Sequence, residues 1–283
     1  HRDLHSFPTR RSSDLLNISN ALAWMGIAST AAGLWGEDDY QKASKELSAK
    51  AKFLTERFTV VEGSTRLNIT IVDTLNNREM HLRGLCPLAS RASLERLREN
   101  LLEIVDKNSL CVVAGSMPPE EFNDNVVKIF DGIKATGAAI VFDSNGGVFG
   151  KIVDAGELFV IKPNLDELGE LLGREVEDNI ESITKAVEPL KNKTQIIIVS
   201  RGQNGAVVFT KDTVVSLKAE IERPVISTVG CGDFLLAGFI GSLTQGADVK
   251  AALENGIKAA TARACGMTSK DWNTIRSIII CKY

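Results

Sequence analysis

The chain has 283 residues, of which 44% are hydrophobic and 24% are charged, and its formal net charge is −3. This length suits one large domain with a sizeable core, and the small net charge gives no reason to expect nucleic acid or an anionic membrane as a partner. The five cysteines are scattered and lack Cys-x-x-Cys spacing. No apolar run approaches the ~20 residues that span a bilayer. We therefore expect a cytoplasmic protein with reduced thiols.

Residues 1–15 differ in character from the rest of the chain. They begin without methionine, contain two of the three histidines and show neither helical nor strand periodicity. No apolar segment follows their arginines, which argues against a signal peptide. We interpret this stretch as a non-native segment that arose during cloning or sequencing, so the organised part of the chain is expected to begin at Leu16.

From Leu16 onward the apolar pattern alternates as it does in parallel α/β proteins. An amphipathic segment at 17–25 leads to an apolar run at 27–34, and 38–57 is predicted to be a helix. Nearly continuous apolar runs, typical of strands covered on both faces, predict strands at 110–114, 138–142, 158–161 and 195–199. Amphipathic stretches predict helices at 93–105, 120–136 and 180–190. This rhythm predicts a doubly wound sheet, whose ligands bind beyond the carboxyl ends of its strands.

One segment interrupts this rhythm. Three closely spaced stretches are strand-like, at 58–62, 66–73 and 79–83. We predict a small β insertion over 58–84, within an α/β domain made of 16–57 and 85–283. A surface hairpin without a role is the alternative interpretation.

A glycine-rich turn precedes the apolar helix expected after residue 230. Gly230 and Gly232 let the backbone turn without Cβ clashes, so that successive N–H groups and the helix N-terminus can face an anion. Asp233 lies among them, where it can take a proton from a hydroxyl nucleophile. The pattern indicates phosphoryl transfer, and an ordinary turn whose aspartate caps a helix is the alternative.

The segment from Thr228 to Phe239 resembles the signature of the PfkB branch of the ribokinase-like carbohydrate kinases. It departs at Cys231, where alanine is usual, and at Phe234, where a hydroxyl residue is usual. Asn17 resembles the asparagine that follows a Gly-Gly-Lys-Gly turn in these kinases. Further matches occur in the family's order at Thr65–Asn68, Gly115–Pro119, Lys162–Glu167 and Ser200–Gly205.

The resemblance implies a three-layer α/β/α fold with a mostly parallel sheet, in which residues 58–84 form a β lid over the sugar. In several members of the family this lid also makes the contact of a homodimer. Residues 1–15 stand where the Gly-Gly-Lys-Gly turn and the first strand are expected. We therefore expect the N-terminal strand of the fold to be missing.

The resemblance also implies a phosphotransferase that uses ATP and Mg²⁺. Asp233 is the expected general base, and the N–H groups at Gly230, Cys231 and Gly232 form the expected anion hole. The residues expected to bind the nucleotide are Lys162, Asn164, Ser200, Gly202, Gly205, Thr228 and Lys258. The residues expected to bind the sugar phosphate are Asn17, Arg66, Asn68, Ser116 and Asp233. Asn164 and Glu167 are expected to hold Mg²⁺, largely through water.

The substrate is predicted from finer similarity within the family. Thr65–Ile69 is most similar to the fructose-1-phosphate kinases, which implies phosphorylation of fructose 1-phosphate at its 6-hydroxyl. Tagatose 6-phosphate and fructose 6-phosphate, phosphorylated at the 1-hydroxyl, are the alternatives. A non-catalytic nucleotide-binding module is an alternative of another class. Asp143, at the end of an apolar run, is expected either to line the cleft or to cap the next helix.

Overall fold

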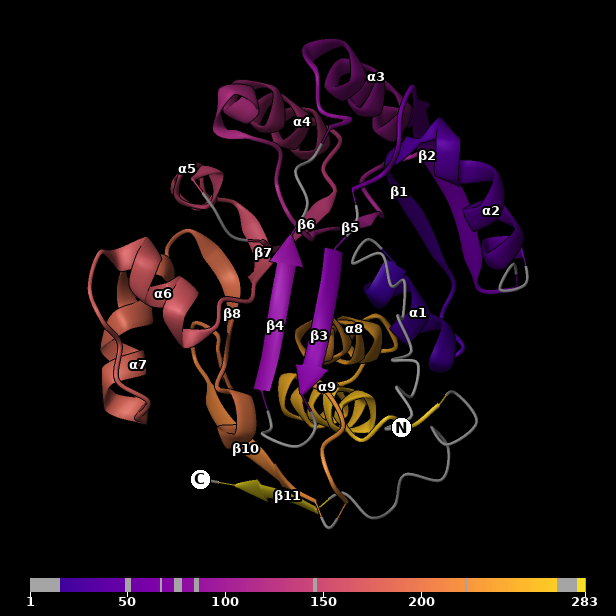
Figure 1. The fold of residues 1–283 in the computed structure, drawn as a ribbon. Coiled ribbons are helices and arrows are strands. Elements are labelled where there is room, and N and C mark those ends of the chain that lie inside the picture. The colour runs from indigo at the N-terminus through magenta and orange to yellow at the C-terminus, as the bar shows by residue number, and fades with distance from the viewer. Residues whose placement is uncertain are drawn as a thin grey trace, which may run out of the picture.

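A seven-stranded sheet forms the centre of the computed structural model, which describes residues 16–48, 52–66, 68–73, 78–83, 87–144, 147–221, 223–268 and 279–282 (Figure 1). Four neighbouring strands run parallel, namely β5 (Leu110–Ala114), β6 (Ala139–Asp143), β7 (Leu158–Ile161) and β8 (Thr194–Ser200). Three antiparallel strands continue the sheet beyond β8, namely β9 (Ala206–Phe209), β10 (Val214–Glu220) and β11 (Ile279–Lys282). The four strands predicted from apolar runs are confirmed to within one residue at each end.

Helices cover both faces of this sheet. One layer contains α3 (Arg91–Leu102), α4 (Asn123–Ala135), α5 (Val148–Asp154), α6 (Leu165–Leu172) and α7 (Ile180–Val187). The opposite layer contains α1 (Asn17–Trp24), α8 (Cys231–Thr244) and α9 (Val249–Ala264). Along β6, Ile140 and Phe142 pack into the first layer and Val141 into the second, as the period of two residues in a strand requires. The predicted three-layer α/β/α fold is therefore confirmed.

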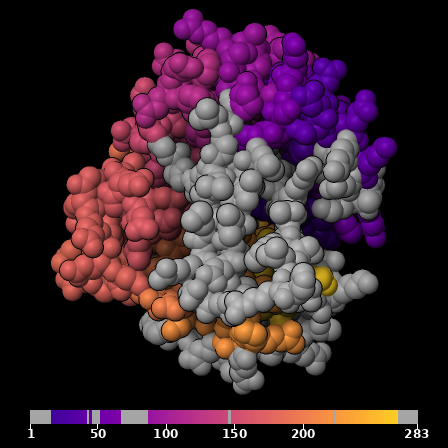
Figure 2. Space-filling model, viewed as in Figure 1, coloured from indigo at the N-terminus to yellow at the C-terminus, as the bar shows by residue number. Residues whose placement is uncertain are grey.

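Short 3₁₀ turns extend two of the predicted helices. The turn η2 (Glu120–Phe122) leads into α4, and η3 (Glu188–Leu190) follows α7, so the predictions at 120–136 and 180–190 each cover two elements. Asn179 begins α7 by accepting a hydrogen bond from the backbone N–H of Ser182. In the space-filling view of the same face, α6 and α7 form the salmon-coloured flank of the molecule (Figure 2).

The region before the hairpin differs from the prediction. The predicted helix at 38–57 is wrong in its second half, because α2 (Glu37–Ser48) ends and the strand β2 (Leu54–Val61) follows. This strand pairs in parallel with β1 (Ser29–Gly36) over eight residues. Its β-branched residues favour a strand, whereas the charges of Glu56 and Arg57 had favoured a helical interpretation. The stretch 58–62 therefore belongs to a β1–β2 sheet and not to the hairpin.

The remaining two stretches of the predicted insertion form an antiparallel hairpin. Strand β3 (Asn68–Asp73) pairs with β4 (Arg78–Arg83) over six residues. The two strands lie side by side at the front of the view in Figure 1. The predicted roles of this hairpin as a lid and as a dimer contact stay predictions.

A cleft of about 1120 Å³ lies between β1 and β5. All five residues of β5 line it and are only half-buried, and residues 29–35 of β1 line its other wall. Within the described residues, β5 ends the seven-stranded sheet and β1 pairs with β2 alone, so a backbone edge faces the cleft from each side. A strand placed between β1 and β5 would need these two edges as its hydrogen-bonding partners. That a first strand belongs here stays a prediction.

Across the ranges that the structure describes, no helix has both the length and the apolar character needed to cross a membrane.

Candidate active site

The candidate site lies at the carboxyl ends of the parallel strands. Ser116 follows β5, Asp143 ends β6, Lys162 follows β7 and Ser200 ends β8. These strands are parallel, so their carboxyl ends meet at the same edge, where doubly wound sheets bind ligands.

The glycine turn at the start of α8 places Asp233 near these strand ends. This helix belongs to the layer formed by α1, α8 and α9. Gly230 is the N-cap of α8 in the left-handed conformation, with φ +78°, which glycine adopts without strain. The N–H of Cys231 donates to the carbonyl of Thr228 at 3.1 Å, and the N–H of Phe234 donates to the carbonyl of Gly230 at 3.0 Å. The N–H groups of Gly232 and Asp233 belong to the first helical turn, which offers no intrahelical acceptor. The N–H of Cys231, one of the three predicted anion-hole donors, is thus used within the turn, and the anion hole itself stays a prediction.

Asp233 is held by an asparagine from the other end of the chain. Asn17 Nδ2, at the start of α1, donates to Asp233 Oδ2 at 2.7 Å. Asn17 is only 3% exposed, which fixes its amide in place. Gly230, the N-cap of α8, has no side chain to cap the helix, and the alternative that Asp233 is a helix cap stays open. The structure therefore brings two predicted site residues together and makes Asn17 a direct partner of the expected base.

Lys162 lies beside the same turn. Its Nζ is 3.0 Å from Asp143 Oδ1, and the two side chains are only 7% and 11% exposed. A Cβ on Gly232 would come within 3.2 Å of this Nζ, so the ammonium group touches the turn. Burial on its own lowers the pKa of Lys162, but the carboxylates of Asp143, Glu167 and Asp233 outweigh it and raise the pKa above its usual value. Lys162 is therefore a charged residue at the centre of the site, and Asp143 lines the site as its partner.

Asn164 and Glu167 have a structural role that is clear from their contacts. They form a capping box at the start of α6, in which Glu167 N donates to Asn164 Oδ1 at 2.8 Å and Asn164 N donates to Glu167 Oε2 at 2.9 Å. Within the described residues, no group of three His, Cys, Asp or Glu side chains has the arrangement of a metal site. Asn164 and Glu167 supply the amide and carboxylate oxygens that a hydrated hard cation such as Mg²⁺ prefers, and their predicted role in holding it stays a prediction.

The loop between β8 and β9 contains the predicted nucleotide-binding glycines. It includes the 3₁₀ turn η4 (Gly202–Asn204), and the N–H of Arg201 closes it by donating to the carbonyl of Gly205 at 2.8 Å. A Cβ on Gly205 would lie 2.0 Å from the carbonyl oxygen of Leu217, so only glycine fits there. Thr228 contributes its carbonyl to the α8 turn, whereas Lys258 is half-buried on α9, and no contact described here joins it to the turn.

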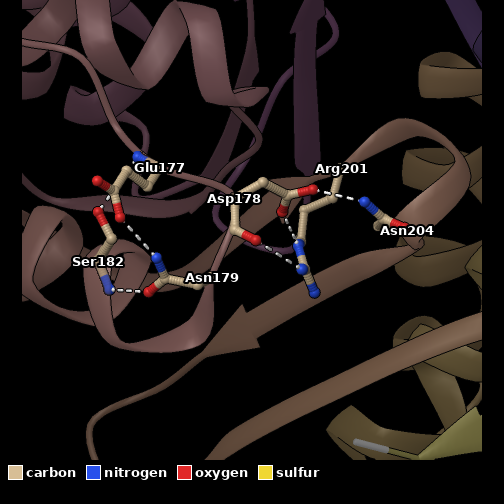
Figure 3. A network of polar contacts seen from close by, with 6 residues as sticks. All are labelled: Glu177, Asp178, Asn179, Ser182, Arg201 and Asn204. Atoms are coloured by element: carbon tan, nitrogen blue, oxygen red, sulfur yellow. Dashed lines mark hydrogen bonds and ion pairs between the residues drawn. The ribbon is translucent and has the colours of Figure 1, made fainter.

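A polar network fixes this loop (Figure 3). Asp178 Oδ1 accepts from Arg201 Nε at 2.5 Å, and Asp178 Oδ2 accepts from Asn204 Nδ2 at 2.6 Å. The next residue, Asn179, caps α7 and donates to Glu177 at 2.9 Å. One carboxylate thus ties the start of α7 to both ends of η4. Sequence analysis did not select Asp178, because nothing in its local pattern indicates a partner 23 positions away.

The predicted sugar-binding residues lie at the mouth of the β1–β5 cleft. The guanidinium of Arg66 donates from Nη2 to Ser116 Oγ. The preceding residue is anchored, because Thr65 N donates to Asp39 Oδ2 at 2.7 Å and Gly36 N donates to Thr65 Oγ1 at 2.9 Å. Asn68 begins β3, and its side chain lies outside the described part of the structure. Arg66 and Ser116 are thus brought together, with Asp39 as a support that sequence analysis missed.

The site can therefore perform two tasks at neighbouring places. The pair of Asn17 and Asp233 offers an oriented carboxylate next to N–H groups and the Lys162 ammonium, which suits proton removal during attack on a phosphoryl group. Arg66 and Ser116 offer donors suited to an anionic substrate.

Comparisons with known proteins agree with this chemistry. The model of the family described as pfkB family carbohydrate kinase matches residues 15–269. A 1-phosphofructokinase of Borreliella burgdorferi is 29% identical over 252 residues, which cover 88% of this chain and 79% of the relative. A tagatose-6-phosphate kinase of Staphylococcus epidermidis is 29% identical over 231 residues, which cover 81% of this chain and 73% of the relative. The solved structure of phosphofructokinase-2 from Escherichia coli in complex with fructose-6-phosphate has the same fold, with a TM-score of 0.82 at 21% identity over 92% of this chain and 84% of that chain.

Proposed function

Because the chain belongs to the pfkB family of carbohydrate kinases, we propose that it transfers the γ-phosphoryl group of ATP to the 6-hydroxyl of fructose 1-phosphate, giving fructose 1,6-bisphosphate. The observation that carries this proposal is the oriented Asp233 carboxylate, bound by Asn17 and adjacent to the buried Lys162. The named 1-phosphofructokinase relatives support the choice of sugar.

Asp233 is the general base of the proposed reaction. Its carboxylate accepts the proton of the sugar hydroxyl while the hydroxyl oxygen forms a bond to the γ-phosphorus. The bond from that phosphorus to the bridging oxygen of ADP breaks, and ADP leaves. Asn17 holds Oδ2 at 2.7 Å, which orients the carboxylate without taking its charge.

Lys162 and the first-turn N–H groups stabilise the charge of the phosphoryl group. The ammonium of Lys162 touches the turn at Gly232, and the helix N-terminus adds a partial positive charge. When bound, Mg²⁺ neutralises part of the charge of the nucleotide phosphates, and Asn164 and Glu167 are the residues that would hold it through water.

Arg66 binds the phosphate that the sugar already carries. Its planar guanidinium can bind two phosphate oxygens at once, and Ser116 Oγ keeps it at the mouth of the cleft. The hairpin of β3 and β4 closes over the sugar and excludes water, and it also provides the contact surface of a homodimer. The loop from Ser200 to Gly205 binds the nucleotide.

Replacing Asp178 by Ala is expected to raise the KM for ATP about tenfold and to leave kcat nearly unchanged, because the loop loses the carboxylate that orders it.

Burial raises the pKa of Asp178, but hydrogen bonds from Arg201 and Asn204 outweigh it, and the pKa is lowered from the usual 3.8. The stability that Asp178 adds is therefore present above that usual pKa and is lost as the pH falls through its folded value. Denaturant titration at several pH values checks this, since the difference between wild type and Asp178→Ala should shrink only at acid pH.

Glu177→Ala is the matched control for Asp178→Ala. Within the described residues, the Glu177 carboxylate accepts a hydrogen bond from Asn179 and none from the loop, and the Glu177 backbone N–H donates to Ser182 Oγ (Figure 3). An equal rise of the KM for ATP in both variants would contradict the role given to Asp178.

An assay of ADP release with fructose 1-phosphate, fructose 6-phosphate and tagatose 6-phosphate in parallel tests the proposed function. It is run on the 283-residue chain and on a version that carries a strand and a Gly-Gly-Lys-Gly turn ahead of Leu16. We expect the highest kcat/KM with fructose 1-phosphate. Preference for another of the three sugars changes the substrate and keeps the reaction, whereas ATP binding without turnover of any of them supports a non-catalytic nucleotide-binding module.

A further inference from the structure

Phe234 departs from the hydroxyl residue usual in the family signature, and its surroundings give it a specific role. The ring is only 4% exposed and packs edge-on against Trp24 of α1, with 4.9 Å between ring centroids and 77° between planes. The guanidinium of Arg263, from the last turn of α9, lies over the same ring with Cζ 5.7 Å from the centroid. Residues of α1, α8 and α9 thus hold the guanidinium of Arg263 next to the start of α8.

Arg263 also touches the glycine turn itself. A Cβ on Gly230 would lie 3.5 Å from Arg263 Nε and 3.2 Å from Asn17 Nδ2. The guanidinium is therefore adjacent to the amide that binds Asp233. Lys162 approaches the same turn at Gly232, so the two cations flank the start of α8.

The two cations differ in their partners. Lys162 is paired with Asp143, whereas in the part of the chain that the structure describes the half-buried guanidinium of Arg263 has no carboxylate and no hydrogen-bond acceptor. A guanidinium has five N–H donors, and a ring face satisfies none of them as an acceptor oxygen does. An anionic ligand with several oxygens would supply the missing acceptors.

We propose that Arg263 binds the terminal phosphoryl group of the nucleotide at the α8 turn, with Phe234 as the support that holds the guanidinium in place. The inference rests on the proposed kinase function and adds a phosphate-binding residue to it. Arg263 neutralises charge on the oxygens of the phosphoryl group during its transfer and forms no covalent bond. In this chain, the guanidinium held by Phe234 thereby takes the place of the hydrogen bond that a hydroxyl residue at position 234 would make.

A purely structural role makes a different prediction. A cation in the last turn of a helix interacts favourably with the helix dipole, and this alone would affect stability and not phosphate binding. Lys134 occupies the equivalent last-turn place in α4, away from the α8 turn, so Lys134→Met is a matched control.

Arg263→Met tests the inference through binding and turnover. By calorimetry we expect the Kd for ATP to rise about tenfold while the Kd for ADP stays unchanged, because only ATP carries the terminal phosphate. We expect kcat to fall about 10²-fold, the effect of removing one donor to a developing oxyanion, and added guanidinium ion to restore part of it. Phe234→Leu, which keeps an apolar side chain but removes the ring, should shift both quantities in the same direction by less.

The outcomes for this inference and for the kinase function are separable. Unchanged Kd values for both nucleotides in Arg263→Met, or equal losses in Lys134→Met, overturn the role of Arg263 whether or not the wild type phosphorylates a sugar. A wild type that turns over none of the three sugar phosphates but binds ATP more tightly than Arg263→Met overturns the proposed reaction and supports the phosphate contact.

Discussion

Replacing Asp233 by Asn is expected to lower kcat by about 10²–10⁴-fold, the usual contribution of a general base. Asn has the same size and can still accept a hydrogen bond from Asn17 Nδ2, so the thermal midpoint of unfolding should change little. The amide cannot take the proton of the sugar hydroxyl, and the loss therefore falls on kcat more than on KM. Steady-state kinetics with the preferred sugar phosphate, together with a thermal melt, checks both parts.

Asp248→Asn is the control for this substitution. Asp248 accepts a hydrogen bond from Ala251 N at 2.7 Å and caps α9, so it is an aspartate at a helix start without a place in the site. Its variant should keep wild-type turnover. Activity of Asp233→Asn within a few-fold of wild type would sink the assignment of the base.

Lys162→Met is expected to have a large effect on both stability and activity. The substitution removes an ammonium group that is 3.0 Å from Asp143 and leaves that nearly buried carboxylate without its partner. Breaking a buried pair in this way typically costs about 3–5 kcal/mol in the free energy of unfolding. Turnover should fall as well, because the ammonium touches the turn that we propose faces the phosphoryl group. Urea unfolding and kcat measure the two effects separately.

The double variant Lys162→Met/Asp143→Asn separates folding from chemistry. Removing both charges eliminates the unpaired carboxylate, so most of the lost stability should return while turnover stays low. Lys185→Met is the matched single control, since Lys185 pairs with Glu181 on the exposed surface of α7, and it should leave stability and kcat nearly unchanged. Full recovery of turnover in the double variant would show that Lys162 has only a structural role.

The pH dependence of the Lys162 contribution follows from the direction of its pKa shift. The carboxylates of Asp143, Glu167 and Asp233 outweigh burial and raise its pKa above the usual 10.5. The pair therefore stabilises the fold fully below that usual value, and the contribution is lost only as the pH rises through the folded pKa. The difference in stability between wild type and Lys162→Met should thus be constant from about pH 6 to about pH 9 and decrease at strongly alkaline pH.

The strands of the central sheet could be predicted from the sequence because their side chains are apolar on both faces. The run at 158–161 has the bounds of the mostly buried β7, and the run at 110–114 has the bounds of β5, whose half-buried apolar residues line the cleft. The β1–β2 sheet was harder to predict. Its residues at 54–57 mix charged and β-branched side chains, and the partner strand, not local propensity, decides their conformation.

The residues of the site could be predicted by type, but not by their contacts. Asp233 and Lys162 follow from the family signature, whereas the pairing of Asn17 with Asp233 and of Asp143 with Lys162 depends on how distant elements pack. Arg263 has no motif of its own, and its place becomes clear only from its contact with Phe234. The sequence alone shows only that Phe234 stands where a hydroxyl residue is usual in the family signature.

The contact between Asn17 and Asp233 has a consequence for how the protein folds. The two residues are 216 positions apart, and they meet only after α1 has packed against α8. Contacts of such long sequence separation require closure of a large loop, which makes them slow to form. The helices and the central parallel strands can form from nearer neighbours, so a refolding chain would regain its secondary structure before Asp233 is oriented. We therefore expect recovery of activity to lag behind recovery of the far-ultraviolet circular dichroism signal during refolding.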